Sequence, residues 1–397
     1  MITKENLHML EMLADIIHDR TPKPIASEEW MAIRKELSSQ GVLTMIALNC
    51  NGLQLDSESQ TFMRTQLNVN MHHFYRILET QTAVVSALEE AGISVTVLKG
   101  SAAAMNYPVP ELRLMGDIDI LVSKDKFEDA FRVLNKNGYA CENSLEDYYC
   151  RHIEFRNKEG IEIELHRYFA SNDESEKCRK MNDYLNNALE KVEHIEINGY
   201  MTPVLPTVAN GMVLLSHLNL HLQEGLGLRH IFDWMCYVER YLDNELWDKE
   251  FSFVAEQMGL AKLAKETTAM CQKYLGLTKE ITWCGLPNEV SDKYIEYVLR
   301  QGNYAAKQED REKKVIKVIR IFEKPFKALA TAQKYGLQNW KRISEKPWLK
   351  PFAWAYQIKR WIRLGLENEV GINVMQKALK KEKTDKCFLD ELELIEK

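Results

Sequence analysis

The feature that most constrains the fold is a cluster of short β-branched runs between residues 93 and 168, set within a chain of mostly helical periodicity. Four segments have the length and composition of strands: 93–98, 117–122, 148–155 and 161–168. Ser123 can cap a helix that ends near Asn137, where Gly138 supplies a left-handed stop. We therefore expect a small α/β unit over about residues 93–200.

Helical spacing of apolar residues dominates on both sides of this unit. It covers residues 5–91 and returns in long segments near 207–223, 229–245, 250–276, 288–335 and 350–383. At 397 residues the chain is long enough for two or three structural units. We expect an α+β protein with a helical region over residues 1–92, a mixed-sheet domain over 93–200 and a larger helical domain over 201–397.

Composition and charge exclude several classes of protein. The N-terminus lacks the basic start and apolar stretch of a secretory signal, and no apolar run approaches the length of a membrane span. The 8 cysteines are scattered without a Cys-x-x-Cys pair, which favours buried thiols. A net charge of -6 argues against a surface that coats nucleic acid. We expect a soluble, cytoplasmic protein with no membrane partner.

Acidic side chains alternate along two of the expected strands. Alternation places Asp117 and Asp119 on one face, and adjacent anions are unfavourable unless a cation lies between them. On the last strand the polar face carries Glu162, Glu164 and His166, so one of its acids can complete the site. Alternation alone does not separate Glu162 from Glu164. Three oxygen ligands from two strands suit Mg²⁺ that also binds substrate phosphates.

A glycine turn precedes the acidic strand. The segment from Lys99 through Gly100 and Ser101 reads as a strand end, a turn and a helix start, where backbone amides can approach a phosphate. The Ser101 hydroxyl can add a contact, and Arg113 offers a planar fork to a phosphate or pairs with Glu111. Lys99 has the same two interpretations, phosphate contact or structure.

These motifs together resemble the DNA polymerase β-like nucleotidyltransferase superfamily, and more narrowly its bacterial branch of uncharacterised nucleotidyltransferases. The resemblance covers residues 95–170 firmly and about 205–240 loosely. It is carried by these segments: Leu98-Lys99-Gly100-Ser101, Tyr107-Pro108, Arg113, Gly116-Asp117-Ile118-Asp119 and Glu164-Leu165-His166. The interval between the turn and the acid pair is longer than in the superfamily, and a Glu stands where a third Asp is more frequent.

The resemblance implies a role for each motif. Gly100 and Ser101 fall on the phosphate turn, Asp117 and Asp119 on the metal pair, and Glu164 on the third acid. The implied reaction is transfer of a nucleoside monophosphate from an NTP to an acceptor hydroxyl, with Mg²⁺ as cofactor and Mn²⁺ as the alternative. A small-molecule acceptor is favoured over RNA or protein. A non-catalytic nucleotide- or partner-binding module with the same fold is the alternative function.

Two features of the C-terminal half have no assigned role. His217 and His221 share a helical face at a spacing compatible with zinc, although a packed polar face is favoured. Arg229 and Asp233 have the spacing of a helix ion pair. A third possibility, which the loose resemblance over residues 205–240 also suggests, is that this face lines the cleft and helps to hold the nucleotide or the acceptor. Residues 307–350 hold 13 Lys or Arg against 5 Asp or Glu, with four tryptophans nearby. This pattern favours a solvated basic face with packed rings over a single-strand binding groove.

Overall fold

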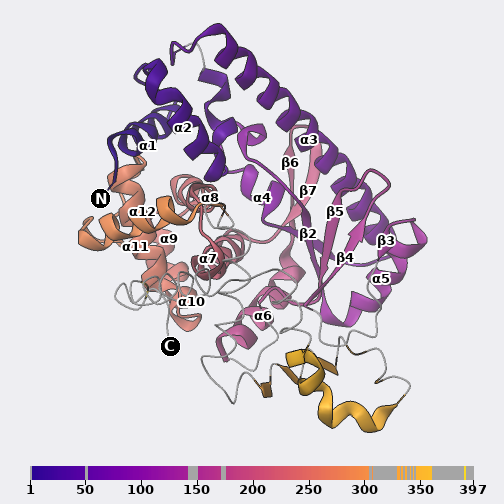
Figure 1. Cartoon of the computed structure of the whole chain (residues 1–397). Coiled ribbons are helices and arrows are strands. Elements are labelled where there is room, and N and C mark those ends of the chain that lie inside the picture. The colour runs from indigo at the N-terminus through magenta and orange to yellow at the C-terminus, as the bar shows by residue number, and fades with distance from the viewer. Residues whose placement is uncertain are drawn as a thin grey trace. The chain divides into compact units, whose positions relative to one another are not determined.

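The computed structural model describes residues 2–49, 52–141, 151–170 and 176–303, with parts of the stretch 306–359 and residue 389. The chain forms two compact units, residues 1–304 and 305–397, and each is described by itself. The first unit has the expected α+β architecture, with helical regions before and after a mixed sheet (Figure 1). The borders expected near residues 92 and 200 fall inside this unit and stay a prediction.

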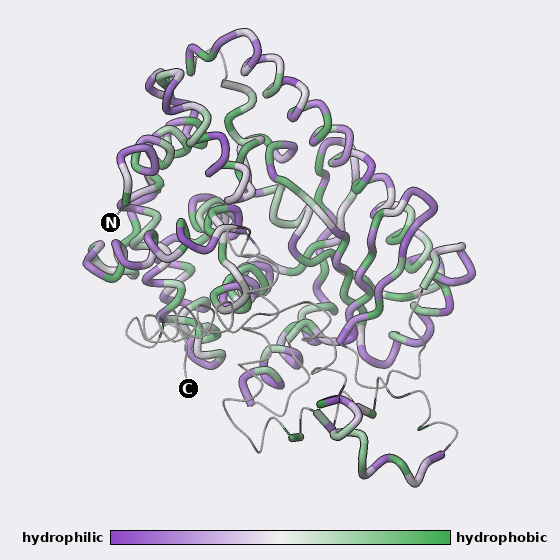
Figure 2. Tube along the Cα trace, in the orientation of Figure 1, coloured by the Kyte–Doolittle hydropathy of each residue, from purple (hydrophilic) through white to green (hydrophobic). Residues whose placement is uncertain are grey.

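The N-terminal region consists of helices α1 (Lys4–Ile17), α2 (Ser27–Ser39) and α3 (Ser57–Glu90), with a 3-10 helix η1 (Leu43–Asn49) between the last two. Asp56 caps α3, because its carboxylate accepts a hydrogen bond from the amide of Ser59 at 2.7 Å. Helix α3 spans 34 residues beside the sheet. Its hydropathy alternates along its length (Figure 2), as expected for a helix with one buried face.

Five strands form the central sheet in the order β1-β2-β5-β4-β3. Their bounds are β1 (Val95–Leu98), β2 (Ile118–Val122), β3 (Ala140–Cys141), β4 (His152–Arg156) and β5 (Glu162–His166). Strands β2 and β5 are parallel, and the other neighbouring pairs are antiparallel. The expected strands are present over shorter ranges, and residues 148–150 of one lie outside the described residues. The single helix expected after Ser123 is present as a 3-10 helix η3 (Lys124–Lys126) followed by α5 (Phe127–Lys136). The side chain of Ser123 makes no capping hydrogen bond.

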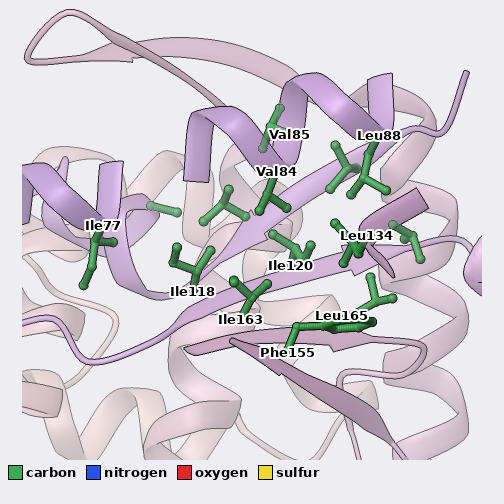
Figure 3. Packing of buried hydrophobic residues seen from close by; sticks show 14 of the residues in the cluster. Ile77, Val84, Val85, Leu88, Ile118, Ile120, Leu134, Phe155, Ile163 and Leu165 are labelled. Atoms are coloured by element: carbon green, nitrogen blue, oxygen red, sulfur yellow. The ribbon is translucent and has the colours of Figure 1, made fainter. Parts of the chain in front are cut away.

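One hydrophobic core of this unit lies between the sheet and the inner face of α3. Figure 3 shows Ile118 and Ile120 of β2 beside Ile163 and Leu165 of β5, with apolar side chains of α3 opposite them. All of these side chains are buried. Because side chains alternate along a strand, burying the isoleucines against α3 turns the acids of β2 and β5 to the other face of the sheet.

A second, two-stranded sheet was not predicted from the sequence. Strands β6 (Glu193–Ile197) and β7 (Tyr200–Val204) form a hairpin that follows helix α6 (Glu176–Ala188) and a short 3-10 helix η4 (Leu189–Lys191). The two turn residues, Asn198 and Gly199, have positive φ angles of 51° and 87°. An Asn-Gly pair is the strongest local signal for such a hairpin, so the sequence did carry this information.

The C-terminal part of the first unit is helical, as expected. It contains α7 (Thr207–Glu224), α8 (Leu228–Arg240), α9 (Asn244–Leu246), a π turn η5 (Trp247–Phe251), α10 (Ser252–Gln257), α11 (Ala261–Tyr274) and α12 (Glu289–Gln301). Helices α7 and α8 approach closely at Gly211, where an added Cβ would lie 2.3 Å from the ring of Tyr237. Among the helices of the described residues, none is long and apolar enough to cross a membrane.

The described part of the second unit contains the 3-10 helix η7 (Pro347–Phe352). The rings of Trp340 and Tyr356 stack 4.9 Å apart, consistent with a packing role for this tryptophan. The side-chain oxygen of Gln333 accepts a hydrogen bond from the backbone amide of Trp354 at 3.0 Å. Residues 307–328 of the basic stretch 307–350 lie outside the described residues, as does Trp361. Nucleic-acid binding by this stretch therefore stays untested.

Candidate active site

The parallel pairing of β2 and β5 brings the three predicted acids together. The register places Asp119 directly beside Glu164, and Asp117 precedes β2 by one residue. One carboxylate oxygen from each of Asp117, Asp119 and Glu164 lies within 4.8 Å of the others. Glu162, the alternative third acid, instead pairs with Arg156 across the β4–β5 ladder. The geometry therefore favours Glu164 as the third member of this acidic group.

Asp119 is the most deeply buried member of the group, with 1% of its surface exposed. Its Oδ1 atom lies 2.8 Å from Nζ of Lys99 and 2.9 Å from Nε2 of His166. Burial alone would raise the pKa of Asp119, but the two cationic partners outweigh burial and hold it below the ordinary range. Its Oδ2 atom is buried without a hydrogen-bond partner among the described residues. A buried carboxylate oxygen left in this state fits a metal ligand.

His166 links two of the acids. Its Nε2 lies 2.9 Å from Asp119 and 3.0 Å from Oε2 of Glu164. Burial lowers the pKa of His166, but the two carboxylates outweigh burial, so its pKa is raised overall. The neighbouring His152, whose Nε2 is 3.7 Å from Oε1 of Glu164, has its pKa lowered to about 4 by burial and by His166. His166 therefore holds two acids in place as a hydrogen-bond donor.

Lys99 and Asp117 respond to the same concentration of charge. Burial disfavours the ammonium of Lys99, but the carboxylates of Asp119 and Asp117 outweigh it, so the pKa of Lys99 is raised. Burial and the negative charge of Asp119 raise the pKa of Asp117, against the opposing effect of Lys99. The single ammonium does not fully offset three neighbouring acids, and a further cation would be stabilised here.

The turn after β1 supplies the second wall of the site. Lys99 and Gly100 adopt positive φ angles of 50° and 42° before the short helix α4 (Gly100–Ala104). A Cβ at Gly100 would lie 3.7 Å from the carbonyl oxygen of Asp117, so the turn runs against the acidic strand. The hydroxyl of Ser101 points elsewhere: it is buried and donates to Oε1 of Gln81 at 2.6 Å. The hydroxyl of Ser101 therefore has a protein partner in this structure, and its contact with a phosphate stays a prediction.

Arg113 is fixed by an acid far away in the sequence. Its Nε and Nη2 atoms each lie 2.7 Å from the carboxylate of Asp233 in α8, and both side chains are buried. Tyr107 donates to the same carboxylate at 2.8 Å. Glu111, the partner considered from the sequence, instead accepts from Tyr75 at 2.9 Å. The expected helix pair of Arg229 with Asp233 is replaced by this bidentate pair, and Arg229 donates to the carbonyl of Leu114 at 3.1 Å.

A single polar pocket joins these groups. It is lined by Lys99, Gly100, Arg113, Gly116, Asp117, Asp119, His217 and Arg229. Five of the seven predicted site residues line this pocket, whereas Ser101 and Glu164 do not. His217 of α7 and Arg229 of α8 also line it, in agreement with the possibility left open from the sequence that this helical face lines the cleft. Asp117, Asp119 and Lys99, which pairs with Asp119, lie on the sheet side of the pocket, and Arg113 and Arg229 lie towards α8.

His166 is the site residue that sequence reasoning came closest to finding. It shares the polar face of β5 with Glu164 at a spacing of two residues, and that alternation was visible in the sequence. The link from His166 to Asp119 depends on β5 lying beside β2, which local pattern does not specify.

A mixed sheet that carries an acid pair and a third acid beside a glycine turn is the arrangement implied by the nucleotidyltransferase resemblance. The chain belongs to the family described as uncharacterised nucleotidyltransferase, whose model matches residues 26–276. Among solved structures it is similar to an antigenic nucleotidyltransferase-like protein from Paracoccidioides brasiliensis, with 15% identity, a TM-score of 0.34, and coverage of 52% of this chain and 93% of that chain. No curated protein matches the chain.

Proposed function

We propose that this protein is a Mg²⁺-dependent nucleotidyltransferase that moves a nucleoside monophosphate from an NTP to an acceptor hydroxyl and releases pyrophosphate. The observation that carries the proposal is the convergence of Asp117, Asp119 and Glu164. Asp117 and Asp119 line a pocket that is also lined by the cationic side chains of Lys99, Arg113 and Arg229. Family membership supports nucleotidyl transfer as the reaction class. We place the chain within the DNA polymerase β-like superfamily on the same motifs.

The donor set fits a hard divalent cation. Asp117, Asp119 and Glu164 offer oxygen ligands, which Mg²⁺ and Mn²⁺ prefer, and Asp119 has a buried oxygen for which the described residues supply no hydrogen-bond donor. Bound there, the cation would polarise phosphoryl oxygens and lower the pKa of an acceptor hydroxyl. His166 would orient two of the ligands through its ring nitrogen.

The cationic wall suits the triphosphate. Lys99, Arg113 and Arg229 line the same pocket as Asp117 and Asp119, so they can neutralise phosphate oxygens and orient the leaving pyrophosphate. Arg113 is held rigidly by Asp233, and a fixed guanidinium loses little entropy when a phosphate binds. In the reaction the acceptor oxygen forms a bond to the α-phosphorus, and the bond from that phosphorus to the bridging oxygen breaks, which releases pyrophosphate. The acceptor hydroxyl gives up its proton towards the carboxylates of the acidic group.

The acceptor is the open part of this proposal. A small molecule with a hydroxyl is favoured over an RNA end or a protein side chain. If the fold instead serves only to bind a nucleotide or a partner, then binding will persist without turnover in the wild-type protein.

The test is Mg²⁺-dependent turnover of NTPs with release of pyrophosphate, measured over a panel of candidate hydroxyl acceptors. Asp119→Asn and Glu164→Gln keep side-chain shape while they remove ligand charge. Each should lower kcat/KM by at least about 100-fold, more than the loss of an outer-shell partner of a metal site. Glu162→Gln is the matched control on the same strand, and it should change activity little.

Activity of Asp119→Asn equal to that of the wild type would overturn the catalytic assignment. Loss of activity in Glu162→Gln but not in Glu164→Gln would reassign the third acid. Binding of a non-hydrolysable NTP without turnover on any acceptor would instead favour the non-catalytic module.

A further inference from the structure

Three buried histidines from two helices meet behind the cationic wall of the pocket. His217 and His221 lie one turn apart on α7, and His230 lies near the start of α8. Only 7%, 5% and 2% of their surfaces are exposed. The ring of His221 lies 4.5 Å from that of His217 and 4.4 Å from that of His230, measured between centroids. One ring nitrogen from each histidine lies within 4.8 Å of the others.

The protonation of these rings leaves lone pairs available. Burial lowers the pKa of all three histidines, and it lowers that of His221 to about 3. Nearby cations, chiefly Lys99 and Arg229, act in the same direction. All three imidazoles are therefore neutral at physiological pH, and neutral imidazole is the form that binds metals.

The spacing of the ring nitrogens matches a shared cation. Nε2 of His217 and Nε2 of His221 are 3.0 Å apart. Two nitrogens bound at about 2.0–2.1 Å to one tetrahedral zinc would be separated by about 3.4 Å. Two neutral rings at the observed distance must otherwise place a proton between them. A proton shared between His217 and His221 does not account for His230, whose ring also brings a nitrogen within 4.8 Å of the other two.

We propose that His217, His221 and His230 form a binding site for one divalent transition metal, with Zn²⁺ as the preferred ion. This site is separate from the acidic group on the sheet. Three protein ligands leave a fourth tetrahedral position, as in zinc sites that bind water or an anion. Because His217 also lines the polar pocket, one ligand of this site borders the pocket that holds Asp117 and Asp119.

The two sites differ in the metals that they select. The sheet site offers oxygen atoms, which suit Mg²⁺ and Mn²⁺, whereas the helical site offers only imidazole nitrogens, which suit zinc, copper, nickel and iron. A second histidine group, His152 with Glu164 and His166, is the competing location for a transition metal. In that group the Nε2 atom of His166 is already engaged with the carboxylates of Asp119 and Glu164, at 2.9 and 3.0 Å.

Metal binding would change two existing contacts. Coordination through both Nε2 atoms would replace the 3.0 Å contact between His217 and His221. The amide of Gly227 lies 3.4 Å from Nδ1 of His230, at the long end of hydrogen-bond distances. Coordination through Nε2 would place the ring proton on Nδ1 and end this contact, whereas coordination through Nδ1 would displace the amide. The loaded protein therefore gives up a weak hydrogen bond at the start of α8.

The test uses the full-length protein and reads metal directly. The protein is stripped with a chelator, incubated with Zn²⁺, desalted and measured by elemental analysis; a parallel sample is titrated with Co²⁺ and followed by visible absorption. We expect about one zinc per chain in the wild type, and Co²⁺ bands typical of a tetrahedral site. His221→Gln and His230→Gln should each weaken binding by more than the about 10–100-fold that an outer-shell change costs.

Two control variants locate the metal. Asp117→Ala with Asp119→Ala removes the sheet acids, and His152→Gln removes the competing histidine group; both should keep the zinc. Circular dichroism of each variant separates loss of metal from loss of fold, and the Co²⁺ titration of the wild type needs no variant. Failure of wild-type protein to retain zinc or to give tetrahedral Co²⁺ bands would overturn the proposal. Zinc that is lost in either control variant but kept in His221→Gln would overturn it as well.

Discussion

Buried histidines on the two walls of the pocket shift their pKa values in opposite directions. His166, on the sheet, has its pKa raised because Asp119 and Glu164 accept its proton, although burial acts against this. His217, His221 and His230, on the helices, have their pKa values lowered by burial and by cations. Each of these four rings is 7% exposed or less, so burial does not distinguish them. The sign of the neighbouring charges decides which wall holds protons and which wall offers lone pairs.

The same contrast holds for the two buried ion pairs. On the sheet wall the acid Asp119 is surrounded by cations and keeps one oxygen without a hydrogen-bond partner among the described residues. On the helical wall Asp233 has both oxygens engaged by Arg113 and also accepts from Tyr107. A carboxylate with an oxygen that accepts no hydrogen bond is suited to bind a ligand, whereas a carboxylate whose two oxygens both accept hydrogen bonds is suited to hold its partners in place.

The largest effect is expected from breaking the saturated pair. Asp233→Ala leaves the buried guanidinium of Arg113 without its carboxylate, so the free energy of unfolding should fall by about 3–5 kcal/mol. Urea unfolding measures this loss. Asp129→Ala, which breaks the exposed pair with Arg132, is the matched control and should cost no more than about 1 kcal/mol. A loss below 1 kcal/mol for Asp233→Ala would show that the pair is not structural.

An intermediate effect is expected in the pH dependence of stability. Below pH 6.5 an unfolded His221 takes up a proton that the folded ring, with a pKa of about 3, does not. Wild-type stability therefore falls towards acid pH, and His221→Gln should remove up to about 1.4 kcal/mol of that fall per pH unit. His166 has the opposite sign: its contribution is complete below pH 6.5 and is lost as pH rises through its raised pKa.

Urea unfolding of chelator-treated protein at several pH values between 4 and 8 measures both variants. The advantage of wild type over His221→Gln should shrink as the pH falls, while its advantage over His166→Gln should shrink as the pH rises. If the stability difference between wild type and variant changed with pH in the same direction for both variants, the opposite pKa shifts inferred for the two walls would be wrong.

The smallest effect is expected behind the glycine turn. Ser101→Ala removes the hydroxyl that donates to Gln81 and leaves a buried acceptor unpaired, which should cost about 1–3 kcal/mol of stability. The KM for the NTP should stay unchanged, because this hydroxyl faces away from the pocket. Urea unfolding and steady-state kinetics separate the two outcomes. A raised KM with unaltered stability would return the hydroxyl to the phosphate site.

The sheet wall was largely predictable from sequence because its determinants are local. Period-two alternation gave the strands and placed Asp117 and Asp119 on one face, and the same alternation placed Glu164 with His166. The choice between Glu162 and Glu164 required the register of β5 on β2, which depends on strand pairing across more than 40 intervening residues. The β6–β7 hairpin was missed although its Asn-Gly turn was present.

The helical wall was much less predictable, because its contacts join residues far apart in the chain. The i,i+4 spacing favoured a pair between Arg229 and Asp233, but Asp233 instead binds Arg113, 120 residues away. A local spacing cannot reveal such a competitor, which gains more from a bidentate geometry than from the helix pair. For His217 and His221 the shared helical face was visible, whereas the arrival of His230 from α8 was not.

The close approach of α7 and α8 at Gly211 limits how related chains can vary. A side chain at this position would occupy the space of the Tyr237 ring, so Gly211 can be replaced only if Tyr237 becomes smaller or moves. His217 and His221 lie on one of these helices, and His230 and Asp233 lie on the other. Covariation at residues 211 and 237 among relatives would therefore mark lineages in which the distance between α7 and α8 has changed. The positions of His217, His221, His230 and Asp233 would have changed with it.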